Sequence, residues 1–122
     1  MAQEPVKRLL EVRTYRLKPG TGPTLHDAFI RKGIPLVKQA GMDVVAFGFS
    51  ADDPSGYFLM RVFSGLEDRQ ATEDAFYSSD AWRKGPRQSI IEHIDSYQDT
   101  LLWLSSEAVE QLRRDLAGAS RP

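Results

Sequence analysis

The chain has no cysteine among its 122 residues. Without cysteine it can form no disulfide bond, thiolate nucleophile or sulfur-ligated metal centre. It also lacks an apolar run of membrane-spanning length and a signal-peptide pattern near its start. Its formal net charge is −1, so it has no surplus of basic residues for binding nucleic acid. We therefore expect a cytoplasmic protein with no membrane insertion and no nucleic-acid partner.

Several catalytic signatures are missing as well. Residues 19–22 lack the lysine and the glycine spacing of a phosphate-binding loop, and no Gly-x-Ser-x-Gly turn is present. His26 and His93 fall on different predicted helices without Glu-x-x-His spacing, so we expect no metal site and no cofactor. His26 lies one position off an apolar stripe and is expected at the surface. His93, beside Glu92 and Asp95, is a weaker general-base candidate, for which a surface or structural role is the alternative.

The sequence does contain regular hydrophobic periodicity. Alternation predicts strands in residues 9–20 (with a closing turn), 42–50, 57–63 and 97–104. Apolar residues at three- and four-residue steps predict helices at 25–40, 64–77, 81–94 and 106–117. Gly33 and Pro35 should kink the first helix, and Ala71, Ala75 and Phe76 should face inward from the second.

The resulting element order, β-α-β-β-α-β, predicts an α+β fold of the ferredoxin-like type. In this fold a four-stranded antiparallel sheet carries both helices on one face. We expect one domain, residues 1–122, with a core at 9–104 and a C-terminal helical tail at 105–122. The tail helix presents Val109, Leu112 and Leu116 on one side and should pack against that core.

The second face of such a sheet has no helix of the core over it. We expect this open face to carry several of seven apolar residues: Leu9, Tyr15, Leu17, Phe47, Phe49, Leu59 and Phe63. An apolar patch of that size is larger than soluble monomers normally expose. The sequence therefore predicts a homodimer formed through the open sheet face.

The first strand places Glu11, Arg13 and Tyr15 on one face, because side chains alternate along a strand. Arg61 joins them from the third strand, which neighbours the first in this topology. Two arginines and a phenol above one cavity favour a small organic ligand with an anionic oxygen. In the alternative interpretation, Glu11 pairs with Arg13 or across strands, Arg61 pairs with Glu11 or Asp99, and Tyr15 contributes packing.

Phe76, Tyr77 and Trp82 flank the predicted break between helices. Aromatic side chains beside a loop can line the mouth of a pocket for a flat ligand. They can equally anchor an irregular segment onto the core through their large buried area. We therefore keep all three as ligand-binding candidates together with the strand residues.

Several motifs resemble the NIPSNAP family, in particular its bacterial members. They are EVRTYRLKPG at residues 11–20, Gly41-Met42, RVF at 61–63, and AFY at 75–77 followed by Trp82. The resemblance covers residues 10–104 and implies membership of the dimeric α/β barrel superfamily. Some family members have His and Trp where this chain has Leu59 and Arg61, so no role of those two positions carries over.

Two functions remain open, one implied by the resemblance and one favoured by the missing catalytic motifs. The wider superfamily includes monooxygenases, isomerases and cyclases, which implies a small cofactor-independent enzyme acting on an apolar or aromatic compound with an anionic or enolisable oxygen. The alternative is a non-catalytic binding or interaction protein that uses the barrel as a dimer scaffold. No residue stands out as a nucleophile, and the sequence leaves open whether the protein is an enzyme.

Overall fold

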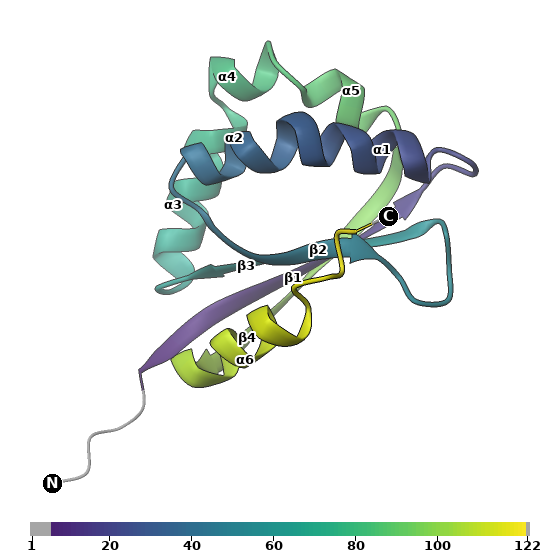
Figure 1. Ribbon diagram of the computed structural model, residues 1–122. Helices are drawn as coiled ribbons and strands as arrows, with labels where there is room; N and C mark the ends of the chain where they lie inside the picture. The colour runs from purple at the N-terminus through teal and green to yellow at the C-terminus, as the bar shows by residue number, and fades with distance from the viewer. Residues whose placement is uncertain (1–5, 122) are drawn as a thin grey trace, which may run out of the picture.

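A computed structural model describes residues 6–121 and shows a four-stranded antiparallel sheet with helices on both sides (Figure 1). The strands are β1 (Lys7–Leu17), β2 (Asp43–Phe49), β3 (Gly56–Phe63) and β4 (Ile94–Ser105), in the spatial order β2-β3-β1-β4. The chain runs β-α-β-β-α-β before its final helix, which confirms the predicted α+β, ferredoxin-like arrangement. β1 and β3 occupy the centre of the sheet, whereas β2 and β4 form its edges.

The first helical region consists of α1 (Gly22–Ala28), a π-helical stretch (Phe29–Gly33) and α2 (Ile34–Gln39). Here the Ile34 N–H donates to the carbonyl of Phe29, five residues earlier. The irregularity lies where Gly33 and Pro35 predicted a kink, because proline has no N–H and its ring displaces the preceding turn. The region ends before Gly41, whose φ of 89° is the left-handed conformation that glycine adopts most easily.

The second helical region contains α3 (Leu66–Tyr77), α4 (Asp80–Arg83) and α5 (Arg87–Ile91). Ser79 caps α4, because its hydroxyl accepts a hydrogen bond from the Trp82 N–H at 3.2 Å. The single helix expected over residues 81–94 is instead two short helices, interrupted at Gly85 and Pro86. β4 starts at Ile94, three residues before the expected strand.

The register of the central strands sets charged residues directly opposite one another. Glu11 of β1 pairs with Arg61 of β3, and Arg13 pairs with Asp99 of β4. Directly opposed residues project from the same face of an antiparallel sheet. All four side chains therefore lie beneath the helix layer α1–α5.

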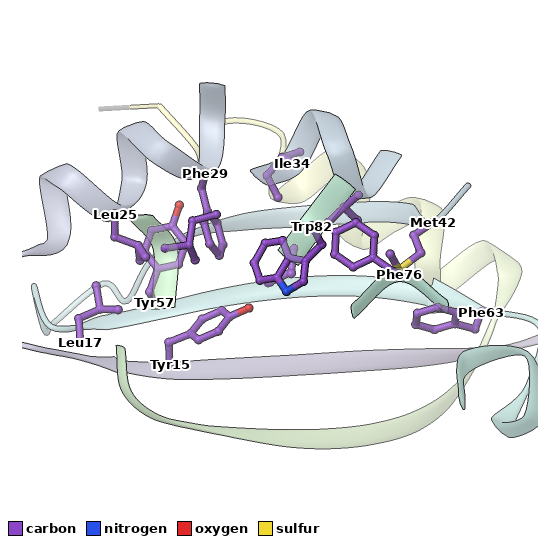
Figure 2. Packing of buried hydrophobic residues seen from close by; sticks show 13 residues of the cluster. Tyr15, Leu17, Leu25, Phe29, Ile34, Met42, Tyr57, Phe63, Phe76 and Trp82 are labelled. Carbon is purple, nitrogen blue, oxygen red and sulfur yellow. The ribbon is translucent and has the colours of Figure 1, made fainter. Parts of the chain in front are cut away.

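The main core lies between this layer and the odd-numbered residues of β1 (Figure 2). It contains most of the residues expected on the open face: Tyr15, Leu17, Leu59 and Phe63 are buried there, Phe47 and Phe49 pack against it, and Leu9 lies opposite Phe63. Their assignment to the open face is therefore wrong. Alternation separates the two faces of a strand, but it does not show which face the helices cover.

A β-bulge changes the faces expected for β2. The pairing with β3 shifts between Val44 and Ala46, so Val45 is an extra residue in this strand. Val44 therefore packs with the main core beside Phe47, whereas Val45 and Ala46 face the opposite side. Strict alternation over residues 42–50 would place Val45 on the face of Phe47 and Phe49, so it holds only beyond the bulge.

The opposite face of the sheet carries a smaller core and α6 (Ser106–Asp115), which lies below the sheet in Figure 1. Val109 is buried in this second core, and Leu112 and Leu116 pack against it, as the periodicity of the tail predicted. α6 covers only part of the face. Val12, Phe58 and Met60 stay partly exposed, and these residues, with Leu102 at 43% exposure, form what we call the open strip.

Beyond α6 the chain crosses the edge of β2. A Cβ atom at Gly48 would collide with the carbonyl group of Ala119, so only glycine admits this close approach. His26 is buried rather than at the surface, because Nε2 lies 2.8 Å from the Ser120 carbonyl and Nδ1 contacts the Tyr57 hydroxyl. A carbonyl only accepts hydrogen bonds, so Nε2 carries the proton that His26 donates to it.

Across residues 6–121, none of the helices combines the length and apolar character that crossing a membrane requires.

Candidate functional site

A cleft of about 900 Å³ lies between the sheet and the helices, at the side where β4 forms the edge. One wall is apolar and is lined by Phe29, Ile34, Val37, Phe76, Trp82 and Ile90. The other end is polar and is lined by Arg13, Arg69, Glu73, Tyr77 and Asp99. This size and lining suit a small organic molecule whose apolar body ends in a polar group.

Arg13 connects three elements at the polar end. Its Nε and Nη2 donate to the two carboxylate oxygens of Asp99 at 2.7 and 3.0 Å, and Nη2 also reaches Glu73 at 3.2 Å. Nη1 donates to the Tyr77 hydroxyl at 3.0 Å, and the guanidinium lies 4.5 Å from the Tyr97 ring centroid. Four of its five N–H donors are therefore used within the protein.

Glu11 and Arg61 form the buried half of the same cluster. Neither residue is measurably exposed, and Arg61 donates to Glu11 through both Nε and Nη2. The other Glu11 oxygen accepts from Arg69 of α3 at 2.7 Å, and Arg69 also reaches Asp99 at 2.9 Å. The whole set, which we call the charge cluster, comprises Arg13, Arg61 and Arg69 with Glu11, Glu73 and Asp99.

The aromatic candidates both pack together and line the cleft. The ring centroids of Phe76 and Tyr77 are 4.9 Å apart, and Trp82 lies 5.4 and 5.5 Å from them. Figure 2 shows the Tyr15 hydroxyl pointing toward the indole of Trp82. Burial raises the pKa of Tyr15, so its phenol stays a hydrogen-bond donor at neutral pH.

Comparison with known proteins decides the family. The NIPSNAP family profile matches residues 10–106, which is most of the chain. The chain belongs to the NIPSNAP family.

Solved structures share the fold of this NIPSNAP protein. A NIPSNAP-family protein of unknown function from Agrobacterium tumefaciens is 23% identical with a TM-score of 0.76, covering 86% of this chain and 95% of that one. A NIPSNAP-like domain protein from Burkholderia xenovorans is 20% identical with a TM-score of 0.74, covering 81% and 86%. A proposed antibiotic biosynthesis monooxygenase from Bordetella bronchiseptica is 17% identical with a TM-score of 0.60, covering 81% and 96%. None of the curated proteins matches the chain significantly.

Within this NIPSNAP protein, Glu73 and Glu11 respond differently to burial. Burial raises the pKa of Glu73 to about 7, and its hydrogen bond with Glu11 adds to that rise against the charges of Arg61 and Arg13. Burial also acts to raise the pKa of Glu11. The bond with Glu73 and the charges of Arg61 and Arg13 outweigh it, and the pKa of Glu11 falls to about 2. The pair therefore takes up one proton as pH falls through about 7, and this proton resides on Glu73.

Not every predicted site residue reaches the cleft. Arg13, Tyr15, Phe76, Tyr77 and Trp82 line it. Glu11 and Arg61 lie behind this lining and act through their ion pair. The cross-strand pairing proposed as an alternative for these two is what the geometry shows.

His93 is not part of the cleft lining. Its side chain lies 3.4 Å from Glu92, and its backbone carbonyl accepts from the Lys18 N–H at 2.9 Å. His93 therefore joins the start of β4 to the turn after β1. No group of three or more His, Cys, Asp or Glu side chains is arranged to hold a metal ion within residues 6–121.

Sequence reasoning missed Arg69 and Glu73 of the NIPSNAP cleft and assigned Asp99 only as a possible partner of Arg61. Ala71 and Ala75, expected to face inward from α3, are exposed, whereas Glu73 is buried. Arg69, Glu73 and Tyr77 recur at four-residue steps, so they share one face of α3. That polar face packs over the charged part of the sheet, a match that the spacing could have indicated.

Proposed function

We propose that this NIPSNAP protein is a small cofactor-independent enzyme, isomerase-like or monooxygenase-like, acting on an apolar or aromatic compound with an ionisable or enolisable oxygen. One observation carries the proposal: Glu73, a carboxyl group whose burial raises its pKa to about 7, lines the polar end of a cleft that has an apolar wall. A group with a pKa near the working pH can both accept and return a proton.

The two arginines that the sequence suggested as ligand-binding residues, Arg13 and Arg61, are poorly placed to bind a ligand in the structure. Arg61 does not line the cleft, and most donors of Arg13 are already bound to Asp99, Glu73 and Tyr77. Tyr15 lines the cleft, and the Arg13 guanidinium beside its hydroxyl can only donate to it, so the phenol O–H remains free to donate. Tyr15 is therefore a better donor to a ligand oxygen than either arginine.

A thermal-shift screen with small aromatic and enolisable compounds tests the proposal. A ligand at about a hundred times its Kd adds about 2.7 kcal/mol to the free energy of unfolding. Tyr15→Phe should lose much of this ligand-induced shift while the melting temperature of the free protein changes little.

Tyr57→Phe is the matched control for that screen. Tyr57 bonds to His26 and lies outside the lining of the cleft, so the variant should lower the melting temperature but keep the ligand-induced shift. If no compound stabilises the wild-type protein, the enzyme proposal fails.

The second candidate is a non-catalytic binding or interaction protein. The charge cluster favours it, because three guanidinium groups and three carboxyl groups can neutralise one another without a ligand. A ligand that binds but is recovered chemically unchanged, with no exchange of its acidic protons into deuterated water, would support this candidate over the enzyme.

We propose that either function operates in a homodimer formed through the open strip. A second copy would bury the exposed Leu102 and the half-buried Val12, Phe58 and Met60. The resemblance of the family to dimeric α/β barrels supports a second copy of this chain as the partner that covers the open strip. Phe47, which was expected on the open face, packs beside His26 under the helices, so a charge at this position would test the core and not the dimer.

Sedimentation equilibrium at micromolar concentration should therefore give a dimer for the wild-type protein and a monomer for Leu102→Asp. Aspartate would place a charge in a desolvated interface without a partner. Ile30→Asp is the control, because Ile30 has the same exposure of 43% but lies on the helix layer. A monomeric wild-type protein would refute the dimer.

A further inference from the structure

The charge cluster carries no fixed charge that could attract an anion. It contains three guanidinium and three carboxyl groups, and its net charge is zero when all are ionised. Arg13 and Arg69, the two arginines of the cluster that line the cleft, share Asp99 between them. An anion that binds at the cluster must therefore compete with carboxylates that are already in place.

Glu73 is the member of the cluster that can change this balance and also reach the cleft. Its Oε1 accepts from Arg13, whereas Oε2 is buried and has no hydrogen-bond donor among the described residues. Arg69 and Arg61 lie 3.3 and 3.4 Å from Oε2 without hydrogen-bond geometry. A buried carboxyl oxygen without a donor is costly as an ion and well placed to hold a proton.

Tyr77 offers the complementary group one turn further along α3. Its hydroxyl oxygen accepts from Arg13 Nη1 and Arg61 Nη1, both at 3.0 Å. With both lone pairs occupied, its own proton finds no acceptor among residues 6–121 and remains available to a ligand in the cleft. Two charged donors on the oxygen also strengthen the hydrogen bond that this proton makes.

We propose that the cleft takes its ligand as a neutral acid, that Glu73 receives the acidic proton, and that Tyr77 donates a hydrogen bond to the oxyanion left behind. This rests on the proposed function and names its substrate class: a phenol, or a ketone with an acidic C–H bond beside the carbonyl. The O–H or C–H bond breaks, its electron pair stays on the ligand as phenolate or enolate, and the proton binds the carboxyl group of Glu73. No oxidant is needed for this step.

Charge balance is the physical reason that proton transfer to Glu73 and binding of the oxyanion occur together. Before transfer, the ligand and the cluster are both neutral. After transfer, the ligand carries one negative charge and the cluster one positive charge, a few ångströms apart in a desolvated site. A carboxylate ligand brings the negative charge without a proton, so it binds well only when Glu73 is already protonated from solvent.

Two aromatic probes of similar size distinguish these cases: 4-nitrophenol, which has a proton to give and changes its absorption spectrum when ionised, and 4-nitrobenzoate, which is already an anion. Above about pH 7 the affinity of the wild-type protein for 4-nitrobenzoate should fall about tenfold per pH unit, because each bound anion requires one proton on Glu73. 4-Nitrophenol should bind with the spectrum of its phenolate, most tightly near the pKa of Glu73. Arg13, Arg61, Arg69 and Glu11, which face Glu73, keep their charges over this range.

Glu73→Gln mimics the protonated carboxyl group permanently. Its affinity for 4-nitrobenzoate should stay constant from about pH 6 to about pH 9, because the cluster now keeps one positive charge. Tyr77→Phe should weaken binding of both probes about tenfold by removing the donor to the oxyanion. Glu67→Gln, in the exposed first turn of the same helix, should match the wild-type protein.

Calorimetric titration of the wild-type protein in two buffers of different ionisation enthalpy counts the protons directly and does not depend on any variant folding. Near pH 7, where Glu73 is about half protonated, binding of 4-nitrobenzoate should take up about half a proton from the buffer. Binding of 4-nitrophenol should take up none there, because the proton that the phenol loses balances the proton that Glu73 gains. If both probes bind without these differences, the inference is wrong and the proposed function stands; if neither probe binds, both fail.

Discussion

Glu11→Gln should lower the free energy of unfolding by about 3–5 kcal/mol, the usual cost of leaving one partner of a buried ion pair uncompensated. Glutamine has nearly the shape of glutamate, so the change removes charge and leaves packing intact. Arg61 has no measurable exposure and would keep its charge beside a neutral side chain. Because Glu73 lies 3.4 Å from Arg61 and can ionise in response, we expect the lower part of this range.

Urea unfolding at neutral pH measures this effect, with Asp53→Asn as the matched control. Asp53 pairs with Arg16 at 2.7 Å, but both side chains are substantially exposed, and such a pair contributes about 0–1 kcal/mol. Adding Arg61→Met to Glu11→Gln should recover much of the loss, because both buried charges are then gone. If Glu11→Gln costs no more than Asp53→Asn, the cluster is not the stabilising ion-pair network described above.

The second large effect is a fall in stability as pH rises, which Glu73→Gln should remove. The pKa of Glu73 is about 7 in the folded protein and 4.5 ordinarily, so the folded state binds more protons between these values. The free energy of unfolding therefore decreases as pH increases through this range, by about 3 kcal/mol in total. Glutamine cannot ionise, so the variant should match the wild-type protein near pH 4.5 and be more stable above pH 7.

Glu11 has the opposite effect at lower pH. Its pKa falls to about 2 from 4.5, so stability increases as pH rises between these values. The combined contribution of Glu11 and Glu73 to the free energy of unfolding is therefore largest near pH 4.5. Urea titrations at half-unit steps of pH would show the maximum, and Glu67→Gln, exposed in the same helix, should leave the profile unchanged. Parallel profiles for Glu73→Gln and the wild-type protein would contradict the raised pKa of Glu73.

The order of elements was predictable from the sequence because it depends on local chemistry. Strand and helix periods, the glycine at position 41 and the proline at 35 act within a few residues of chain. The antiparallel, ferredoxin-like arrangement follows from this order, because few topologies connect such elements with short loops. The amphipathic tail helix was predictable for the same reason, and it packs through Val109 as expected.

Other features depended on contacts between distant parts of the chain. Alternation in β1 marks two faces without saying which one the helices cover, and the extra residue at Val45 reverses the faces of β2 locally. The inward side of α3 is polar because the sheet beneath it presents Glu11, Arg13 and Arg61. An apolar stripe indicates the buried side of a helix only where that side is apolar. The apolar pattern of α3 therefore gave no indication that Glu73 is buried.

The sequence by itself determined the architecture of this protein and five of the residues that line its cleft, because alternation places Arg13 and Tyr15 on one face and turn chemistry sets Trp82 at a helix start. Only the tertiary structure decided which of them could act on a ligand. Arg13 is held by Asp99 from β4, and Glu73 is brought beside Glu11 from another element. A pKa depends on burial and on charges within a few ångströms, and these neighbours come from β1, β3 and α3, which are far apart in the chain.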